Sequence, residues 1–156
     1  MKKSILFVCL GNICRSPAAE AVFLHHAKIK GLESKYKVDS AGTGSWHAGN
    51  RADYRMRKAA LKRGINIESL ARQIVIDDFQ LFDLILTMDN SNLKDVITLS
   101  KQNTNKLAVD IMPLLSFSKK SSLIEVPDPY YGGENGFEEV LDLLEDSIDG
   151  LLKTLT

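Results

Sequence analysis

Apolar and polar positions divide the chain into short strand-like runs and longer segments with helical periodicity. Strands are predicted at Ser4–Val8, Tyr36–Ser40, Asp83–Thr87 and Leu107–Met112. Helices are predicted from Ser16 to Lys30, over Ala52–Arg63, over Asp89–Ser100 and from Phe137 to Leu152. Because strands and helices alternate, we expect residues 1–156 to form one α/β domain. Its expected architecture is a three-layer sandwich, with a four-stranded parallel sheet covered by helices on both faces.

The first strand and the helix after it have the clearest boundary signals. The run Ser-Ile-Leu-Phe-Val at 4–8 has little polarity, as expected of a parallel strand buried on both faces. Ser16 is a favoured N-cap residue and Pro17 suits the first helical position, while Gly31 suits the end of the helix. Ligands of such sheets bind beyond the carboxyl ends of the strands. The loop after the first strand is therefore the candidate site.

Composition and charge narrow the class of protein. Lys and Arg number 20 and Asp and Glu number 20, so the formal net charge is zero, which argues against a nucleic-acid-binding protein. The apolar run Ile5–Leu10 is too short to span a membrane or to serve as a signal peptide, and we interpret the protein as cytoplasmic. The two cysteines, Cys9 and Cys14, lie in one short loop, which indicates chemistry rather than a disulfide framework.

This loop has the features of a phosphate-binding loop. Gly11 and Asn12 readily adopt positive φ, which lets the loop curl, and the helix N-terminus after it attracts anions. No Gly-Lys-Ser/Thr follows, so binding of a nucleoside triphosphate is disfavoured. Arg15 and the helix N-terminus favour a thiolate at Cys9, and the Ser16 hydroxyl can donate to it. Arg15 can also hold two oxygens of a tetrahedral oxyanion. The pattern predicts phosphoryl transfer to the sulfur of Cys9.

A second loop supplies a candidate general acid. Asp128 lies between Pro127 and Pro129, whose rings restrict the backbone around it. We expect Asp128 to protonate the leaving group and then to activate the water that hydrolyses a cysteinyl-phosphate. Tyr130 and Tyr131 follow directly and can form the wall of a slot for an aromatic ring.

The sequence resembles the low-molecular-weight protein tyrosine phosphatases over nearly its whole length. The motifs that carry the resemblance are Cys9-Leu-Gly-Asn-Ile-Cys14-Arg15-Ser16-Pro17, Asp39-Ser40-Ala41-Gly42-Thr43, Ala71-Arg72-Gln73, Thr87-Met88-Asp89 and Asp128-Pro-Tyr-Tyr-Gly132. The resemblance implies hydrolysis of phosphotyrosine without a metal or other cofactor. Phosphotyrosine proteins are the expected substrates, and a monomer or weak dimer is the expected state. Whether one cognate tyrosine kinase is a partner stays open at this point.

The resemblance also assigns roles by position. Cys9 would be the nucleophile, Arg15 the phosphate clamp and Asp128 the general acid. The substrate-binding residues would be Leu10, Gly11, Asn12, Ile13, Cys14, Ser16, Trp46 and Tyr130, with Ser40 and Cys14 as supporting residues. Many family members carry a histidine shortly before the Ala-Arg-Gln segment, paired with the loop asparagine. This chain has Glu68-Ser69-Leu70 there, and we expect Ser69 to take over the contact with Asn12.

Several alternatives stay open at this point. Cys14 either fills space or forms a reversible disulfide with Cys9. Three other functions are alternatives to phosphotyrosine hydrolysis. Arsenate reduction is disfavoured because relatives with that activity need further cysteines, and phosphoarginine hydrolysis is disfavoured because relatives with that activity carry Thr in place of Ile13. A catalytically silent phosphate-binding module would lack the nucleophile or the acid, and both are present here. One group of cations at helical spacing forms either a solvated face or a docking surface for an acidic partner: Arg51, Arg55, Arg57, Lys58, Lys62 and Arg63.

Overall fold

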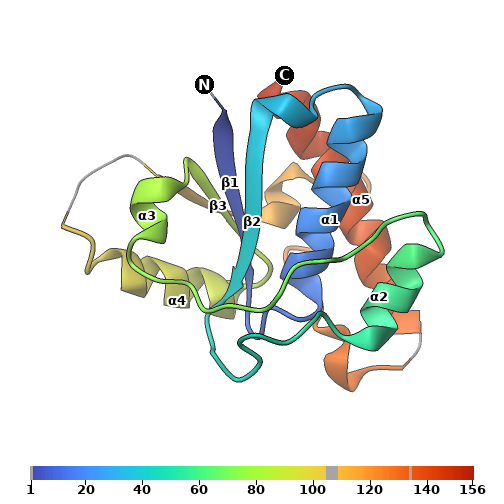
Figure 1. Ribbon diagram of the computed structural model, residues 1–156, viewed down its shortest axis with the longest axis horizontal. Coiled ribbons are helices and arrows are strands. Elements are labelled where there is room, and N and C mark those ends of the chain that lie inside the picture. The colour runs from blue at the N-terminus through green and yellow to red at the C-terminus, as the bar shows by residue number, and fades with distance from the viewer. Residues whose placement is uncertain (1, 105–108, 134) are drawn as a thin grey trace.

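A four-stranded sheet lies at the centre of the computed structural model, which describes residues 2–104, 109–133 and 135–156 (Figure 1). The strands are β1 (Lys3–Cys9), β2 (Tyr36–Gly42), β3 (Leu84–Thr87) and β4 (Asp110–Pro113). They lie in the order β2-β1-β3-β4, and each neighbouring pair is parallel. The strand order therefore reverses at β1, and ligands of such sheets bind beyond the carboxyl end of the strand at that point.

β1 is central because its sequence is apolar on both faces. Ile5 and Phe7 belong to the apolar core on one side of the sheet, and Leu6 and Val8 belong to the core on the other side. All four side chains are fully buried. A strand covered on both faces is a continuous apolar run rather than an alternating one, as in the sequence.

Helices lie on both sides of the sheet, as Figure 1 shows. On one side are α1 (Arg15–Ile29), α2 (Tyr54–Leu61) and α5 (Asn135–Leu155). On the other side are α3 (Asp78–Leu81) and α4 (Asn90–Ser100). Three short 3₁₀ helices lie in the connections: η1 (Glu33–Lys35), η2 (Leu114–Phe117) and η3 (Pro129–Tyr131). The expected α/β three-layer architecture is confirmed.

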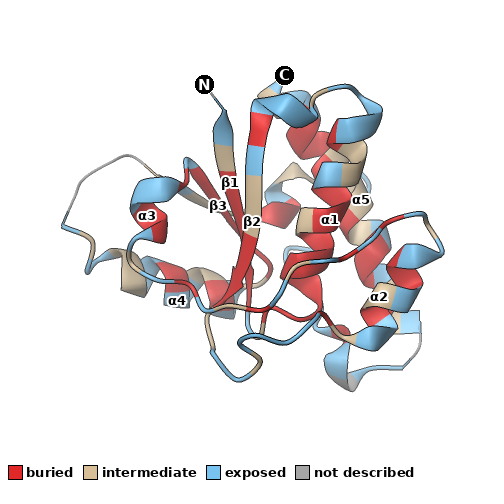
Figure 2. Ribbon diagram, viewed as in Figure 1, coloured by how far each residue is buried: buried red, intermediate tan, exposed pale blue. Residues whose placement is uncertain are grey.

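Two apolar cores hold the layers together, and Figure 2 shows the buried residues gathered along the sheet and the inner faces of the helices. The larger core lies on the side of α1 and α5 and includes Phe23 and Leu141. The smaller core lies on the side of α3 and α4 and includes Phe79 and Val96. Each fully buried side chain of this size contributes roughly 1.5–3 kcal/mol. None of the helices in the described parts of the chain is long and apolar enough to cross a membrane.

α5 packs closely against η2 at Gly150. This glycine is buried in the helix, and a Cβ added to it would collide with the carbonyl oxygen of Phe117. Four residues earlier on α5, the Asp146 carboxylate accepts hydrogen bonds from the Ser118 hydroxyl and from the N–H of Lys119. The end of η2 is thereby fixed to the helix both by packing and by hydrogen bonds.

The predicted helix boundaries need correction. α1 begins at Arg15 with Cys14 at the N-cap position, so the predicted start at Ser16 and Pro17 is wrong. The Ser16 hydroxyl does not cap the helix because it is used inside the loop before it. The helix predicted over 52–63 is shorter and begins after Asp53, whose carboxylate caps it, and the last helix extends beyond its predicted ends.

Two further elements differ from the sequence prediction. α3 has only four residues, too few for a periodic signal, and is not predicted. Of the strand predicted at Leu107–Met112, residues 107 and 108 lie outside the described residues. β4 runs from Asp110 to Pro113 and includes the proline that is expected to end it. Pro113 pairs with Thr87 on an edge strand, where a missing N–H is tolerated.

Candidate active site

The loop between β1 and α1 curls around Asn12. This residue has a φ of 57°, in the left-handed region that asparagine tolerates better than most residues. Its Nδ2 donates to Ser16 Oγ over 2.7 Å, and its Oδ1 accepts from the N–H of Arg72 over 3.0 Å. The predicted positive φ is present at Asn12 but absent at Gly11, where a Cβ would instead approach the His47 ring at 3.1 Å.

The backbone of this loop presents N–H groups rather than carbonyls to a ligand. The carbonyls of Cys9, Leu10 and Ile13 accept hydrogen bonds from N–H groups outside the loop. Within the described residues, the N–H groups of Gly11 and Cys14 have no protein acceptor. Unpaired N–H groups at a helix N-terminus attract an anion, so the loop can bind a phosphate group.

Cys9 lies beneath this loop as the last residue of β1 and is 2% exposed. Its Sγ is 3.0 Å from Ser16 Oγ, and the N–H of Asn12 donates to it over 3.3 Å. Because Ser16 Oγ accepts from Asn12 Nδ2, its own proton can be donated to the sulfur or to the Ala41 carbonyl, which is 3.3 Å away. Donors directed at sulfur stabilise a thiolate.

Arg15 is the first residue of α1, and its side chain is buried. Its Nη1 donates to the Asp89 carboxylate over 2.6 Å and to the Val126 carbonyl over 3.1 Å. Burial alone would lower the pKa of Arg15, but nearby Cys9 and Asp89 outweigh burial and raise it, so the guanidinium stays charged. These contacts fix the plane of the guanidinium, as bidentate hydrogen bonding to an oxyanion requires.

The carboxylate of Asp128 lies close to this guanidinium. Its Oδ2 is 3.6 Å from Arg15 Nη2, and its Oδ1 accepts from the N–H of Tyr130 over 3.0 Å. Two residues earlier, the N–H of Val126 donates to the Met88 carbonyl over 2.7 Å, which fixes the segment to the end of β3. The Asp128 side chain is 34% exposed. The Asp128 carboxylate is therefore held near the Arg15 guanidinium and is still accessible to water. A group that acts first as an acid and then as a base needs both properties.

A cavity of about 350 Å³ joins these groups. Every predicted site residue lines it except Asn12, Ser16 and Ser40. Trp46 and Tyr130 are 71% and 38% exposed, and with Leu10 they form its apolar walls. The cavity thus combines polar groups beneath with aromatic walls above, which suits the phosphate ester of an aromatic ring.

Cys14 has different surroundings from Cys9, although both are buried free thiols. Burial raises the pKa of the Cys14 thiol, and the nearby Asp53 carboxylate raises it further. Cys14 therefore stays protonated at neutral pH, and a protonated thiol is a poor nucleophile.

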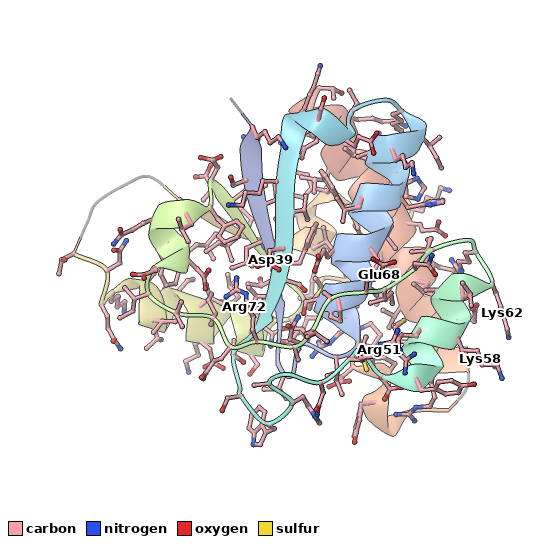
Figure 3. The ribbon with its side chains drawn as sticks, in the orientation of Figure 1. Asp39, Arg51, Lys58, Lys62, Glu68 and Arg72 are labelled. Carbon is pink, nitrogen blue, oxygen red and sulfur yellow. The ribbon has the colours of Figure 1, made fainter. Side chains whose placement is uncertain are left out.

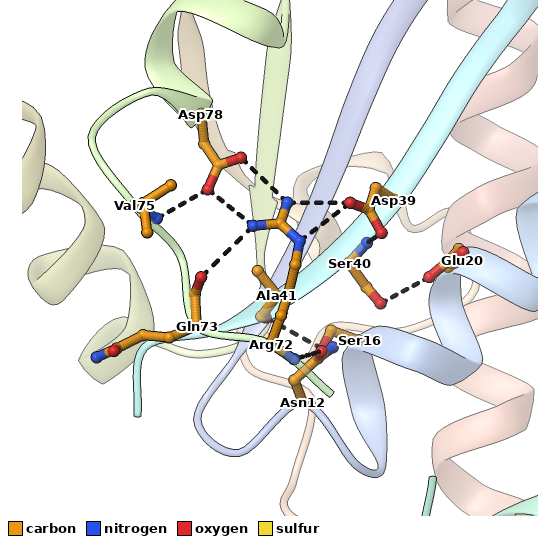
Figure 4. Close-up of polar contacts among 10 residues, drawn as sticks. All are labelled: Asn12, Ser16, Glu20, Asp39, Ser40, Ala41, Arg72, Gln73, Val75 and Asp78. Carbon is orange, nitrogen blue, oxygen red and sulfur yellow. Dashed lines mark hydrogen bonds and ion pairs between the residues drawn. The ribbon is translucent and has the colours of Figure 1, made fainter. Parts of the chain in front are cut away.

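Arg72 connects Asn12 to a charged cluster behind the loop (Figure 4). While its N–H bonds to Asn12, its guanidinium donates to both oxygens of Asp78 at 3.0 Å and to Asp39 at 3.1 Å. Asp78 is buried and also accepts from the N–H of Val75 over 2.8 Å. One side of Asn12 is thereby fixed to a cluster that joins β2 and α3.

Ser69 does not take the predicted place beside Asn12. Its side chain instead forms a hydrogen bond with the carboxyl group of Glu20 on α1, which also accepts from Ser40 Oγ over 2.6 Å. Burial raises the pKa of Glu20 above its ordinary value. Asn12 is held by Arg72 and Ser16 instead, and the supporting role of Ser40 stays a prediction.

Two residues of the site have no role in the sequence prediction. Asp89 orients Arg15, and the Thr87-Met88-Asp89 motif alone does not show this contact. Its position just after β3, at the carboxyl edge of the sheet, is the signal that could have found it. His47 lines the cavity, with its ring 6.3 Å from that of Tyr130, and no linear spacing marks it.

The fold and the site together define a class of protein, the α/β phosphatases that use a cysteine nucleophile. The described residues contain no cluster of three or more His, Cys, Asp or Glu side chains that could hold a metal ion. The cavity is lined by the thiol of Cys9, the guanidinium of Arg15 and the carboxyl group of Asp128.

Comparisons with known proteins give the family. The family described as low molecular weight phosphotyrosine protein phosphatase matches residues 4–156. The chain is 46% identical to the member from Gallus gallus, over 90% of this chain and 87% of that protein. A protein tyrosine phosphatase from Entamoeba histolytica has a TM-score of 0.91 at 44% identity, over 99% of this chain and 97% of that one. A Drosophila arginine phosphatase has a TM-score of 0.93 at 33% identity, over 100% and 98%.

The chain therefore belongs to the low molecular weight phosphotyrosine protein phosphatase family, as the resemblance implied. It is a protein-tyrosine phosphatase, and a cysteine nucleophile is general to its family.

Proposed function

We propose that Cys9, Arg15 and Asp128 carry out phosphotyrosine hydrolysis in this chain. The observation that carries the proposal is their arrangement around one cavity. The Cys9 sulfur lies beneath unpaired N–H groups, and Arg15 Nη2 lies 3.6 Å from Asp128. A phosphate group bound by the loop would have the nucleophile on one side and the acid on the other.

In the first step, the Cys9 thiolate attacks phosphorus in line with the tyrosyl oxygen. The sulfur–phosphorus bond forms, the bond between phosphorus and the tyrosyl oxygen breaks, and Asp128 gives its proton to the leaving oxygen. Arg15 and the loop N–H groups bind the three remaining oxygens, whose charge they stabilise in the transition state.

In the second step, Asp128 takes a proton from water as the water oxygen attacks phosphorus. The sulfur–phosphorus bond breaks and inorganic phosphate is released. Cys9 leaves as a thiolate, which the Ser16 hydroxyl and the N–H of Asn12 stabilise. Cys14 stays protonated and takes no part in this cycle.

Aromatic substrates fit the walls of the cavity. Trp46 and Tyr130 would flank the tyrosine ring, and Ile13 adds an aliphatic contact beside the phosphate. Since one structural neighbour is an arginine phosphatase, phosphoarginine is the substrate to compare with phosphotyrosine. The aliphatic side chain of Ile13 favours the aryl ester.

The remaining features of the proposal concern the setting of the enzyme. Residues 1–156 form one catalytic domain, active as a monomer or weak dimer on phosphotyrosine proteins that a cognate tyrosine kinase supplies. A cytoplasmic location is consistent with two free thiols in the site, since reducing compartments preserve thiols.

The test is hydrolysis of p-nitrophenyl phosphate in excess EDTA by the wild type and by Cys9→Ser. We expect activity that survives EDTA in the wild type and is lost in the variant, because serine is a far weaker nucleophile here. A phosphotyrosine peptide and a phosphoarginine peptide are then compared. Activity in Cys9→Ser would overturn the assigned nucleophile, and preference for phosphoarginine would overturn the assigned substrate.

A further inference from the structure

A second cavity, of about 420 Å³, lies beside the catalytic one. It is formed by α2 on one side and by Gly132, Gly133 and the first turns of α5 on the other. The rings of Tyr54 and Phe137 are part of its lining, and Tyr54 is exposed. The proposed reaction uses no residue of this cavity.

Two lysines give this cavity its charge. Lys58 and Lys62 lie one turn apart, on α2 and just after it (Figure 3). Both line the cavity. Both are exposed. Within the described part of the chain, no carboxylate lies within ion-pair distance of either ammonium group.

The other charged groups nearby already have partners. Arg55 pairs with Asp53 at 2.9 Å, and Arg63 pairs with Glu138, Asp142 and Glu145 of α5. Glu138 also lines the cavity; its Oε2 is bound to Arg63, whereas its Oε1 is buried and has no hydrogen-bond partner among the described residues. Among the described residues that line this cavity, Lys58 and Lys62 are thus the cations without an ion-pair partner, although the net charge of the whole chain is zero.

The linings of the two cavities contact each other at Tyr130 and Arg55. Tyr130 lines the catalytic cavity, and Arg55 lines the second one. Arg55 Nη2 donates to the Tyr130 carbonyl over 3.2 Å, and its guanidinium lies 5.3 Å from the Tyr130 ring and 4.8 Å from the Phe137 ring. A peptide that places phosphotyrosine beside Tyr130 can therefore pass over Arg55 into the second cavity.

We propose that this second cavity binds an acidic side chain of the substrate protein, close in sequence to the phosphotyrosine. The inference deepens the proposed function and rests on it. Lys58 and Lys62 would bind the carboxylate, while Tyr54 and Phe137 would contact the methylene groups that carry it. These lysines would select among phosphotyrosine sites without touching the reacting atoms.

The test uses phosphotyrosine peptides in which a pair of glutamates is moved stepwise along either side of the phosphotyrosine. Each peptide has a glutamine counterpart of the same length. The variant Lys58→Gln/Lys62→Gln is compared with Lys35→Gln/Lys37→Gln, which removes the same charge from exposed positions in η1 and β2. The rate on p-nitrophenyl phosphate, which is too small to reach the second cavity, shows whether each variant is folded and active.

In the wild type, we expect a higher kcat/KM for glutamate than for glutamine at one placement, by about three- to tenfold, as two exposed ion pairs allow. Lys58→Gln/Lys62→Gln should abolish this preference and leave the p-nitrophenyl phosphate rate unchanged. The control variant should keep the preference, and added salt should weaken it.

Three results would count against the inference. A wild type that hydrolyses all the peptides equally would overturn it and leave the proposed function intact. Survival of the preference in Lys58→Gln/Lys62→Gln would show that these two lysines do not cause it. Loss of the preference in the control variant would show that overall charge, and not this cavity, is responsible. No hydrolysis of p-nitrophenyl phosphate by the wild type would overturn the proposed function itself.

Discussion

Cys9 and Cys14 are the same side chain in the same loop, yet their surroundings separate their chemistry. Cys9 has two donors directed at its sulfur, from Ser16 and Asn12. Cys14 has the Asp53 carboxylate nearby and a pKa that burial raises. The proposal that Cys9 and not Cys14 is the nucleophile therefore rests on the neighbours of each sulfur, and Ser16, seven positions from Cys9, is one of them.

The proposed proton transfer by Asp128 gives a prediction that depends on the leaving group. Asp128→Asn keeps the shape of the side chain but cannot donate a proton, so we expect kcat on a phosphotyrosine peptide to fall by about 10²–10⁴-fold. The loss on p-nitrophenyl phosphate should be smaller, because p-nitrophenolate leaves more easily without a proton. Steady-state kinetics on both substrates measure the difference. Asp95→Asn, at an exposed position of α4, is the matched control. Equal losses on the two substrates would contradict an acid role.

At the residue scale, the sequence is informative where chemistry is carried by residues close together in the chain. Cys9, Arg15 and Ser16 lie within one loop and helix start, so their spacing indicates a phosphate site. The contacts of Arg15 with Asp89 and of Asn12 with Arg72 join residues 74 and 60 positions apart. No local pattern predicts such pairs, and the expectation that Ser69 would hold Asn12 is wrong for that reason.

Close packing between α5 and η2 makes one glycine essential. Glycine to alanine usually favours a helix by about 1 kcal/mol, but at Gly150 the new Cβ would collide with the Phe117 carbonyl. We expect Gly150→Ala to destabilise the protein by about 1–3 kcal/mol in urea unfolding.

Gly136→Ala is the matched control for this substitution. Gly136 lies in the first turn of the same helix, and its Cβ would meet only ordinary contacts at 3.6 Å. This variant should be neutral or more stable by up to about 1 kcal/mol. If both variants change the free energy of unfolding equally, the packing explanation fails.

The cluster around Arg72 predicts coupling between β2, α3 and the phosphate loop. Arg72→Met would leave the buried carboxylate of Asp78 without its guanidinium, and we expect a loss of about 1–3 kcal/mol in unfolding free energy. Asp78→Asn should reduce that loss when combined with Arg72→Met, because the amide carries no charge to compensate. Strict additivity of the two changes, measured by urea unfolding, would contradict the ion-pair account.

At the scale of elements, the strong periodic signals predict most of the fold. The apolar run of β1 and the stripe along α5 are long enough to decide the type of element. α3 is too short to show a period. The start of α1 is misplaced because Ser16 has the composition of an N-cap but serves the loop instead, where its hydroxyl contacts Cys9 and Asn12.

The pH dependence of stability should reflect the partly buried carboxyl group of Glu20. Burial raises its pKa in the folded protein, so the folded state holds this proton more tightly than the unfolded chain does. Its contribution to stability is therefore full below the unfolded pKa, near 4.5, and is lost as pH rises through the higher folded value. Glu20→Gln resembles the protonated form and removes this dependence.

The corresponding measurement is the free energy of unfolding at about pH 5 and about pH 8. The wild type should lose more stability than Glu20→Gln between the two values. Lys37→Gln, which changes an exposed charge on β2, should follow the wild type. A steeper loss in Glu20→Gln than in the wild type would reverse the sign and contradict the assignment.

For the whole molecule, alternation of strands and helices predicts the class of fold and the edge of the sheet where the site lies. It does not predict the order β2-β1-β3-β4, because the pairing of β1 with β3 joins segments about 80 residues apart. Composition does not predict how charge is distributed over the molecule. The net charge is zero, but a cationic α2 lies beside an acidic α5.

Asn12 meets three demands at once, and this limits how position 12 can vary among working descendants of this sequence. Glycine would accept the φ of 57° but supply neither hydrogen bond. Aspartate would accept from Arg72 but would draw the proton of Ser16 to itself and away from Cys9. Larger side chains would be strained in the left-handed region. Position 12 is therefore nearly closed to evolutionary drift.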